Sequence, residues 1–282
     1  MFPILKTRRL APSIVEFRIE APLIARKRKP GNFVMVRIDE TGERIPLTIA
    51  DSDETAITLI VQAVGKTTHA LCAMKAGDAL RDVVGPLGTP TPIRNYGDVA
   101  CIGGGVGTAE LYPIAQALHE AGNRVHTIIG GRTRELVILE DEMRQHSATL
   151  QVTTDDGSYG QRGLVTDALR SLMEGETHLE AVYAIGPMSM MKAVADMTRE
   201  SAIHTVVSLN TIMVDGTGMC GGCRVTVGGQ MKFACVDGPE FDAHSVDFDE
   251  LIMRSRTYAE QEREAHERHL CKLAEAGREA ER

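Results

Sequence analysis

The chain has 282 residues, 43% of them hydrophobic and 25% charged, which is enough to fill two cores and a small third unit. Its formal net charge of -8 provides no broad basic field, so we expect neither a nucleic-acid partner nor a membrane-surface partner. No apolar stretch approaches the length of a signal peptide core or a membrane span, so we expect a cytoplasmic protein.

The N-terminal part of the chain, residues 1–95, alternates short β-branched runs with turn residues. These runs cover residues 13–19, 32–38 and 56–61. Short strands at regular spacing are typical of small all-β folds. We therefore predict an N-terminal antiparallel β-barrel.

From residue 96 to residue 206 the pattern changes, and strands alternate with helices. This alternation indicates a doubly wound parallel sheet, the usual form of an α/β nucleotide-binding domain. The expected strands are 99–102, 125–129, 150–153 and 181–185, and the expected helices are 109–121, 136–146 and 165–173.

Two further segments follow the predicted sheet. Residues 207–245 are rich in glycine and cysteine and fit neither earlier pattern, which indicates a small separate domain. Residues 246–282 have a helical pattern and are strongly charged. Such a tail is either a solvated terminal helix or a helix that docks onto a partner. The whole chain is thus predicted to be an α+β multidomain protein.

A glycine cluster lies between the first predicted strand of the α/β domain and its first helix. In this setting glycines let backbone amides approach a pyrophosphate at the helix N-terminus. The alternative is a tight structural turn, but the strand-turn-helix context favours nucleotide binding. The candidate residues are Gly103, Gly104, Gly105, Gly107 and Thr108.

Two later turns are candidates for the remainder of the nucleotide site. After the second strand, Arg132 would meet a 2'-phosphate and Glu135 a ribose hydroxyl, so these residues leave NAD and NADP both open. The turn Gly186-Pro187-Met188 follows another strand, at the edge where open α/β sheets bind ligands. It would flank a nicotinamide ring, or it is a plain strand-to-helix turn.

The predicted barrel carries two candidate cofactor-binding segments. In the first, Arg44 offers a positive fork for a phosphate and Thr48 a hydroxyl for a ring nitrogen. The backbone amides after Gly65 would form an anion nest at a helix start. Arg44 as a surface charge and Thr67 as a helix cap are the alternatives. The candidates are Arg44, Pro46, Leu47 and Thr48, with Gly65, Lys66, Thr67 and Thr68.

Three cysteines and one aspartate follow one another in the glycine-rich segment. Asp215, Cys220, Cys223 and Cys235 form the pattern D-x4-C-x2-C-x11-C, which contains the C-x2-C part of a plant-type ferredoxin loop. The spacing favours a 2Fe-2S cluster over zinc or free thiols. Thr217 or an exogenous ligand would replace Asp215 if the carboxylate is not the fourth ligand.

The remaining cysteines are scattered, and scatter suggests packing. They are Cys72, Cys101 and Cys271.

A barrel with these elements followed by a nucleotide domain resembles the ferredoxin-NADP reductase superfamily. That resemblance implies FAD on the barrel, bound through an Arg-x-aromatic-Ser/Thr motif, and NAD(P)H on the second domain. The chain departs from the motif because Arg44 lies four residues before Thr48 and Leu47 replaces the usual aromatic residue. Ile185 also stands where the superfamily has a cysteine before its Gly-Pro turn.

A narrower resemblance rests on these motifs together with Gly85-Pro86-Leu87-Gly88, the segment 154–160 and the cysteine loop. They are similar to the electron-transfer subunits of the dihydroorotate dehydrogenase group. Asp215, the Gly-Pro-Met turn and the charged tail look most like the small subunits of NADH-dependent reduced ferredoxin:NADP oxidoreductases, a family of flavin-bifurcating transhydrogenases also described as sulfide dehydrogenases.

The resemblance implies a subunit with FAD, NAD(H) and a 2Fe-2S cluster. It also implies a heterodimer with a larger iron-sulfur flavoprotein, which carries a second FAD and 4Fe-4S clusters and handles NADP(H) and ferredoxin. Hydride would pass between NAD(H) and FAD, and single electrons through the cluster to the partner. No catalytic side chain beyond the cofactors is expected. Two rivals are a dihydroorotate dehydrogenase electron transfer subunit and a zinc-stabilised, nucleotide-sensing regulatory module.

Overall fold

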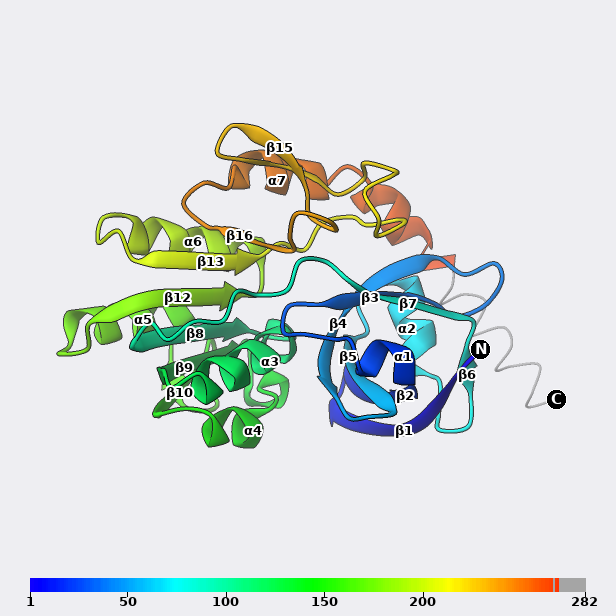
Figure 1. Cartoon of the computed structure of the whole chain (residues 1–282), viewed down its shortest axis with the longest axis horizontal. Coiled ribbons are helices and arrows are strands. Elements are labelled where there is room, and N and C mark those ends of the chain that lie inside the picture. The colour runs from blue at the N-terminus through cyan, green and yellow to red at the C-terminus, as the bar shows by residue number, and fades with distance from the viewer. Residues whose placement is uncertain (266, 269–282) are drawn as a thin grey trace.

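The computed structural model describes residues 1–265, 267 and 268, and Figure 1 shows the barrel beside an α/β layer with the cysteine-rich segment above both. Two seven-stranded sheets and one two-stranded sheet account for the strands of this part of the chain. The predicted fold class is confirmed. The domain limits 1–95, 96–206, 207–245 and 246–282 remain predictions.

The N-terminal sheet is antiparallel throughout and curls into a nearly closed barrel. Its strands follow the order β6-β1-β2-β5-β4-β3-β7, and the two edge strands β6 and β7 are consecutive in the chain. Alternating apolar side chains fill the interior, where Phe17 and Leu59 are fully buried. The elements are β1 (Phe2–Ala11), β2 (Ile14–Glu20), α1 (Pro22–Ala25), β3 (Phe33–Arg37), β4 (Arg44–Ser52), β5 (Ala56–Gln62), α2 (Lys66–Cys72), β6 (Ala79–Leu80) and β7 (Asp82–Leu87).

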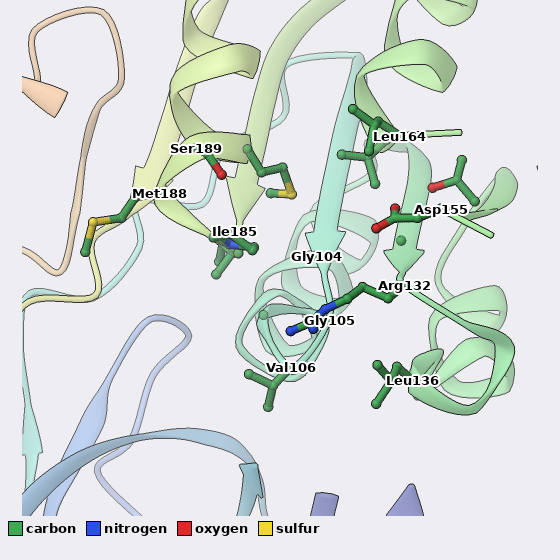
Figure 2. A pocket seen from close by; sticks show the side chains of 18 of the residues that line it. Gly104, Gly105, Val106, Arg132, Leu136, Asp155, Leu164, Ile185, Met188 and Ser189 are labelled. Carbon is green, nitrogen blue, oxygen red and sulfur yellow. The ribbon is translucent and has the colours of Figure 1, made fainter. Parts of the chain in front are cut away.

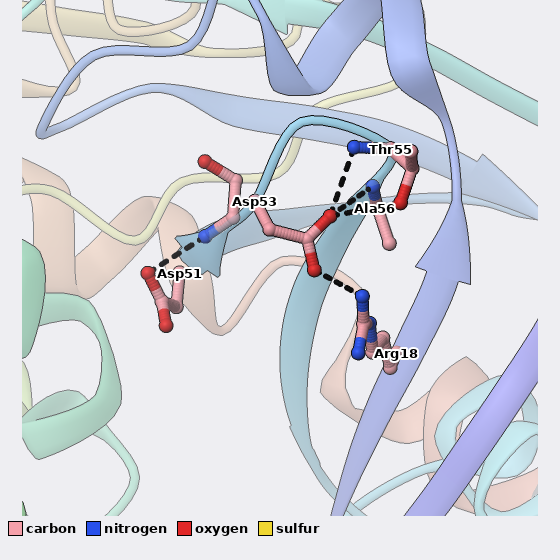
Figure 3. A network of polar contacts seen from close by, with 6 residues as sticks. Arg18, Asp51, Asp53, Thr55 and Ala56 are labelled. Atoms are coloured by element: carbon pink, nitrogen blue, oxygen red, sulfur yellow. Dashed lines mark hydrogen bonds and ion pairs between the residues drawn. The ribbon is translucent and has the colours of Figure 1, made fainter.

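The turn between β4 and β5 is held by one carboxylate (Figure 3). The side chain of Asp53 accepts hydrogen bonds from the backbone N–H of Thr55 at 2.8 Å and of Ala56 at 2.9 Å, and it pairs with Arg18 on β2. The hydrogen bonds from Thr55 are the main reason that the pKa of Asp53 lies below its ordinary value. Asp53 therefore stabilises the turn that joins β4 to β5.

The second sheet is parallel through six strands, in the order β11-β10-β9-β8-β12-β13. Helices α3 and α4 pack on one face, and α5 and α6 pack on the other, as expected for a doubly wound sheet. The elements are β8 (Asp98–Gly104), α3 (Gly107–Glu120), β9 (Arg124–Gly131), η1 (Arg134–Leu136), α4 (Glu140–Gln145), β10 (Thr149–Thr154), β11 (Gln161–Arg162), α5 (Val165–Glu174), β12 (Leu179–Ile185), α6 (Met188–Arg199) and β13 (His204–Ser208).

The helix predicted for residues 136–146 is wrong in its first half. A short 3-10 turn ends at Leu136, and the helix α4 begins only at Glu140. Ile138 and Leu139 are both buried, and Leu139 has a left-handed backbone with φ of 57°. A continuous helix would turn two adjacent residues about 100° apart, whereas this bend places both side chains in the core.

The cysteine-rich segment contains more regular structure than its composition suggests. β14 and β15 form a hairpin around Gly228 and Gly229, whose φ values are +58° and +72°. Two consecutive positive φ values are the signature of a tight hairpin turn, so the Gly-Gly pair was a missed strand signal. The elements are β14 (Arg224–Val227), β15 (Gln230–Phe233), β16 (Glu240–Asp242) and α7 (Phe248–Ser255).

The cysteine-rich segment is joined to both larger units. β16 pairs antiparallel with β13 and becomes the seventh strand of the α/β sheet. Met213, Cys223 and Cys235 pack in one apolar cluster with Phe33 and Met35 of the barrel.

The predicted C-terminal helix is observed in part. It begins at Phe248 and ends at Ser255 in α7, and residues 259–265 are again helical. The predicted tail segment 269–282, with Cys271, lies outside the described residues.

Candidate functional site

The larger cavity, of about 670 Å³, opens at the carboxyl ends of β8, β9, β10 and β12. This is the edge where open α/β sheets bind ligands. Seven of the predicted nucleotide-site residues line it, and Figure 2 shows several of them around the opening. They are Gly104, Gly105, Gly107, Arg132, Gly186, Pro187 and Met188.

Gly103, Gly104 and Gly107 of the glycine loop are packed too closely for side chains. A Cβ on Gly107 would lie 2.4 Å from the carbonyl oxygen of Ile185, and one on Gly103 would lie 2.8 Å from Thr108 Oγ1. Gly103 and Thr108 therefore join strand β8 to helix α3 behind the cavity wall. Gly105 has φ of +57° and donates its N–H to the Gly130 carbonyl at 2.8 Å. The loop is thus shaped for a ligand close to its backbone.

The charged residues that line the larger cavity differ from those that were predicted. Arg132 and Asp155 both line the cavity and are drawn at its wall in Figure 2. Glu135, the predicted ribose partner, lies in the 3-10 turn η1, is exposed and is not among the lining residues. Its role in binding stays a prediction. Asp155 could have been predicted as a cavity residue from the sequence, since it is an acidic residue that directly follows strand β10.

A smaller cavity, of about 270 Å³, lies between the barrel and helix α3. Four of the eight predicted barrel residues line it, namely Pro46, Leu47, Thr48 and Thr68. The other four, Arg44, Gly65, Lys66 and Thr67, lie on the same β4 strand and at the start of helix α2 but do not line this cavity.

A side chain of helix α2 itself caps the N-terminal end of that helix. Thr68 Oγ1 accepts the N–H of Gly65 at 2.9 Å and that of Val64 at 3.0 Å, while Thr67 Oγ1 bonds the carboxylate of Glu43. The N–H groups of Val64 and Gly65 are therefore already used. An anion at this helix start would have to use the N–H groups that follow Gly65.

The two cavities meet. Five residues line both, namely Gln62, Val106, Glu110, Ser208 and Asn210. Glu110 is in the first turn of helix α3, and burial raises the pKa of its carboxyl from 4.5 to about 7. A hydrogen bond with Thr48 opposes this shift because it favours the charged form. The sequence prediction missed Glu110, although an acid three residues after Gly107 was a usable signal.

A second buried carboxyl lies nearby. Glu240 Oε1 accepts a hydrogen bond from Thr91 Oγ1 at 2.7 Å, and burial raises the pKa of Glu240 to about 7. The charge of Glu110 raises it further. Among the described side chains, Glu240 Oε2 and Thr211 Oγ1 are buried without a hydrogen-bond partner.

Two of the predicted cluster ligands touch. Cys223 Sγ and Cys235 Sγ are 3.2 Å apart and almost fully buried. Asp215 accepts hydrogen bonds from the backbone N–H of Cys220 at 2.7 Å and of Thr217 at 2.8 Å. Cys220 is exposed, and within the described chain no three His, Cys, Asp or Glu side chains converge on one point. The complete ligand set therefore remains a prediction.

The residues of each site suit the predicted group. Burial and the neighbouring Cys223 raise the pKa of the Cys235 thiol to about 12, so a metal bound there would have to displace its proton. Gly216 has φ of +75°, and a Cβ there would meet Met35 and Leu87 at 2.7 and 2.8 Å, which brings the loop against the barrel. The unpartnered Thr211 hydroxyl lines the smaller cavity, which suits a polar ring system there.

The smaller cavity and the cysteine pair share a wall. Phe33 and Met213 line the cavity and also pack in the apolar cluster that contains Cys223 and Cys235. The larger cavity, the smaller cavity and the cysteine pair thus follow one another in a continuous series. Such a series is expected of an oxidoreductase that binds a dinucleotide and carries an iron-sulfur segment.

Comparisons with known proteins agree with this class. Residues 101–196 match the oxidoreductase NAD-binding domain, and residues 210–247 match the iron-sulfur cluster binding domain of dihydroorotate dehydrogenase B. The chain is 50% identical to the Thermotoga maritima dihydroorotate dehydrogenase B (NAD(+)) electron transfer subunit homolog, over 97% of each chain. It is 34% identical to the Streptococcus mutans electron transfer subunit, over 87% of this chain and 97% of the relative.

The chain belongs to the family of dihydroorotate dehydrogenase B electron transfer subunits and their homologues. It is also 49% identical to a solved structure of the NADH-dependent reduced ferredoxin-NADP oxidoreductase, from work on flavin-based electron bifurcation. The TM-score is 0.91, and the match covers 96% of this chain and 98% of that chain. The predicted electron-transfer class, NAD-binding domain and iron-sulfur segment are confirmed.

None of the helices in the described residues combines the length and the apolar character that a membrane crossing requires.

Proposed function

We propose that this chain is the small subunit of a heteromeric oxidoreductase and passes electrons between NAD(H) and a larger iron-sulfur flavoprotein. That partner would handle NADP(H) and ferredoxin, as in an NADH-dependent reduced ferredoxin-NADP oxidoreductase. The observation that carries the proposal is the series of larger cavity, smaller cavity and cysteine pair, linked by shared residues. FAD held in the smaller cavity would supply the conversion between the two-electron chemistry of nicotinamide and the one-electron chemistry of a 2Fe-2S cluster held by the cysteine segment.

The chain's own residues have distinct parts in this proposal. The glycine loop and Arg132 bind the dinucleotide phosphates, while Pro187 and Met188 limit where its nicotinamide end lies. Thr48 would orient the flavin, while Thr68, whose hydroxyl caps helix α2, lines the same cavity. Arg44, Lys66 and Thr67 lie beside this cavity and would bind the flavin phosphates.

The cysteine segment has the remaining roles. Cys220, Cys223 and Cys235 would hold the cluster with Asp215 as the fourth ligand. Phe33 and Met213 exclude water from the space between the smaller cavity and the cysteine pair, because both pack against that apolar cluster. The free thiols of Cys72 and Cys101 support a reducing, cytoplasmic location.

The test is purification from the native source, with a spectrum, metal analysis and identification of bound proteins. Flavin absorbance with dithionite-bleached iron-sulfur bands and a copurified large iron-sulfur flavoprotein are expected. A dihydroorotate oxidase as the copurified partner would instead assign the chain to dihydroorotate dehydrogenase, which the names of several relatives favour. A colourless, zinc-containing protein would refute electron transfer altogether.

A further inference from the structure

Glu110 lies at the point where the two cavities meet. Of the five residues that line both, it is the one with an ionisable side chain. If the larger cavity holds the dinucleotide and the smaller one the flavin, hydride transfer requires the two rings to meet at this junction. The nicotinamide ring would therefore come beside Glu110. This step rests on the proposed function.

The nicotinamide ring changes charge when it reacts. It is uncharged in NADH and carries one positive charge in NAD+, whereas the remainder of the dinucleotide is unchanged. A carboxylate beside the ring therefore favours the oxidised form, and a neutral carboxyl does not. We propose that Glu110 discriminates between the two redox forms of the nicotinamide, its ionised carboxylate strengthening the binding of NAD+ specifically.

The environment of Glu110 allows both charge states near neutral pH. Burial favours the neutral carboxyl, while the Thr48 hydroxyl and the N-terminal end of helix α3 favour the carboxylate. The balance gives a pKa of about 7. Binding of a cationic ring would draw the proton off Glu110, and by linkage the ionised carboxylate would bind that ring more tightly.

Other charged groups lie on the elements around helix α3 and beside Glu110. Glu240 on β16 interacts with Glu110 and with Tyr183 on β12. Asp51 on β4 and Glu142 on α4 act instead on Tyr112 of α3. Further charged groups are Arg132 and Asp155, which line the cavity at the ends of β9 and β10, and Asp98, Arg124 and Glu180, which lie at the amino ends of β8, β9 and β12.

The test measures nucleotide binding by the flavin- and iron-loaded protein between pH 6 and pH 8.5. The two ligands are NAD+ and 1,4,5,6-tetrahydro-NAD, whose ring is uncharged and cannot donate hydride. Opposite unit charges about 6 Å apart at an effective dielectric constant of about 40 change a binding constant roughly tenfold. We expect NAD+ affinity to rise roughly tenfold with pH and the affinity of the uncharged analogue to stay constant.

Three variants test whether Glu110 causes the pH dependence of NAD+ affinity. Glu110→Gln should bind NAD+ with the same, weaker affinity at every pH. Glu120→Gln, at the exposed end of the same helix, is the matched control and should behave as wild type. Glu240→Gln should keep the pH dependence, because Glu110 retains its buried carboxyl and its Thr48 partner.

A second measurement needs no variant. Wild-type protein should release protons when NAD+ binds at pH 7 in weak buffer, and should release none when the uncharged analogue binds. A pH-independent NAD+ affinity in wild type, no proton release, or a full pH response in Glu110→Gln would each overturn the inference. Wild-type protein that binds no NAD+ at any pH would instead refute the proposed function.

Discussion

Replacing Gly107 with alanine should weaken dinucleotide binding by a predictable amount. The new Cβ would lie 2.4 Å from the Ile185 carbonyl oxygen and 2.9 Å from Gly186 Cα. Ordinary contact begins at 3.4 Å, so the glycine loop and the turn at Gly186 must separate by about 1 Å. Both contacts are backbone atoms, and no side chain can rotate away to relieve them.

The expected cost follows from packing energetics. Overpacking of this kind costs about 1–3 kcal/mol, and the gain from placing alanine instead of glycine in a helix offsets about 0.5–1 kcal/mol of it. A net cost of about 1–2 kcal/mol, realised in the loop that binds the pyrophosphate, lowers NAD+ affinity roughly five- to thirtyfold.

Equilibrium dialysis with NAD+ measures this change, and the flavin spectrum checks that the protein remains folded. Gly175→Ala is the matched control, because its Cβ would meet only Leu172 O at 3.4 Å and Ser171 O at 3.5 Å. It should bind NAD+ as the wild type does. A folded Gly107→Ala protein with wild-type NAD+ affinity would refute the reasoning.

Three further predictions concern the cysteine segment and Glu240. Cys223→Ser should lose the iron absorbance but keep the flavin bands; metal analysis and a visible spectrum check this. Asp215→Cys should change the reduction potential and the EPR spectrum, and unchanged values in both would show that Asp215 is not a ligand. The raised pKa of Glu240 means that the folded state holds its proton more tightly than the unfolded chain. Stability should therefore fall as pH rises from about 4.5 to 7 and then level. Glu240→Gln should reduce this fall, by up to about 3 kcal/mol near pH 8. Thermal melts at pH 5 and pH 8 test it, and identical pH dependence in both proteins would contradict it.

The sequence predicted those features that depend on local spacing. The glycine loop, the barrel motif around Thr48 and the Cys220-to-Cys223 spacing all lie within short segments, where chemistry and backbone shape are set by neighbours in the chain. The fold class followed from strand and helix periodicity. The bend at Leu139 was not predictable from periodicity, because tertiary burial of two adjacent residues outweighed helix propensity.

The sequence could not predict which residues meet across segments. Glu110 becomes a junction residue only because helix α3 packs against β4, so that Thr48 from the barrel lies beside it. Phe33 and Met213 are 180 positions apart, and only the docking of the cysteine segment on the barrel places both beside the cysteine pair. Such pairings depend on the docking of whole units, and no local spacing encodes them.

The position of β16 shows where the barrel, the α/β sheet and the cysteine segment contact one another. β16 begins at Glu240, pairs with β13 of the α/β sheet and bonds Thr91 in the connection after the barrel. A Cβ on Gly31 would lie 2.4 Å from Thr91 Oγ1 and 2.8 Å from Glu240 Oε1, so the barrel also contacts this point. Barrel, sheet and cysteine segment therefore meet at one buried carboxyl. This contact, the pairing of β13 with β16 and the packing of α3 on β4 together hold the two cavities and the cysteine pair in one arrangement, which an electron relay requires.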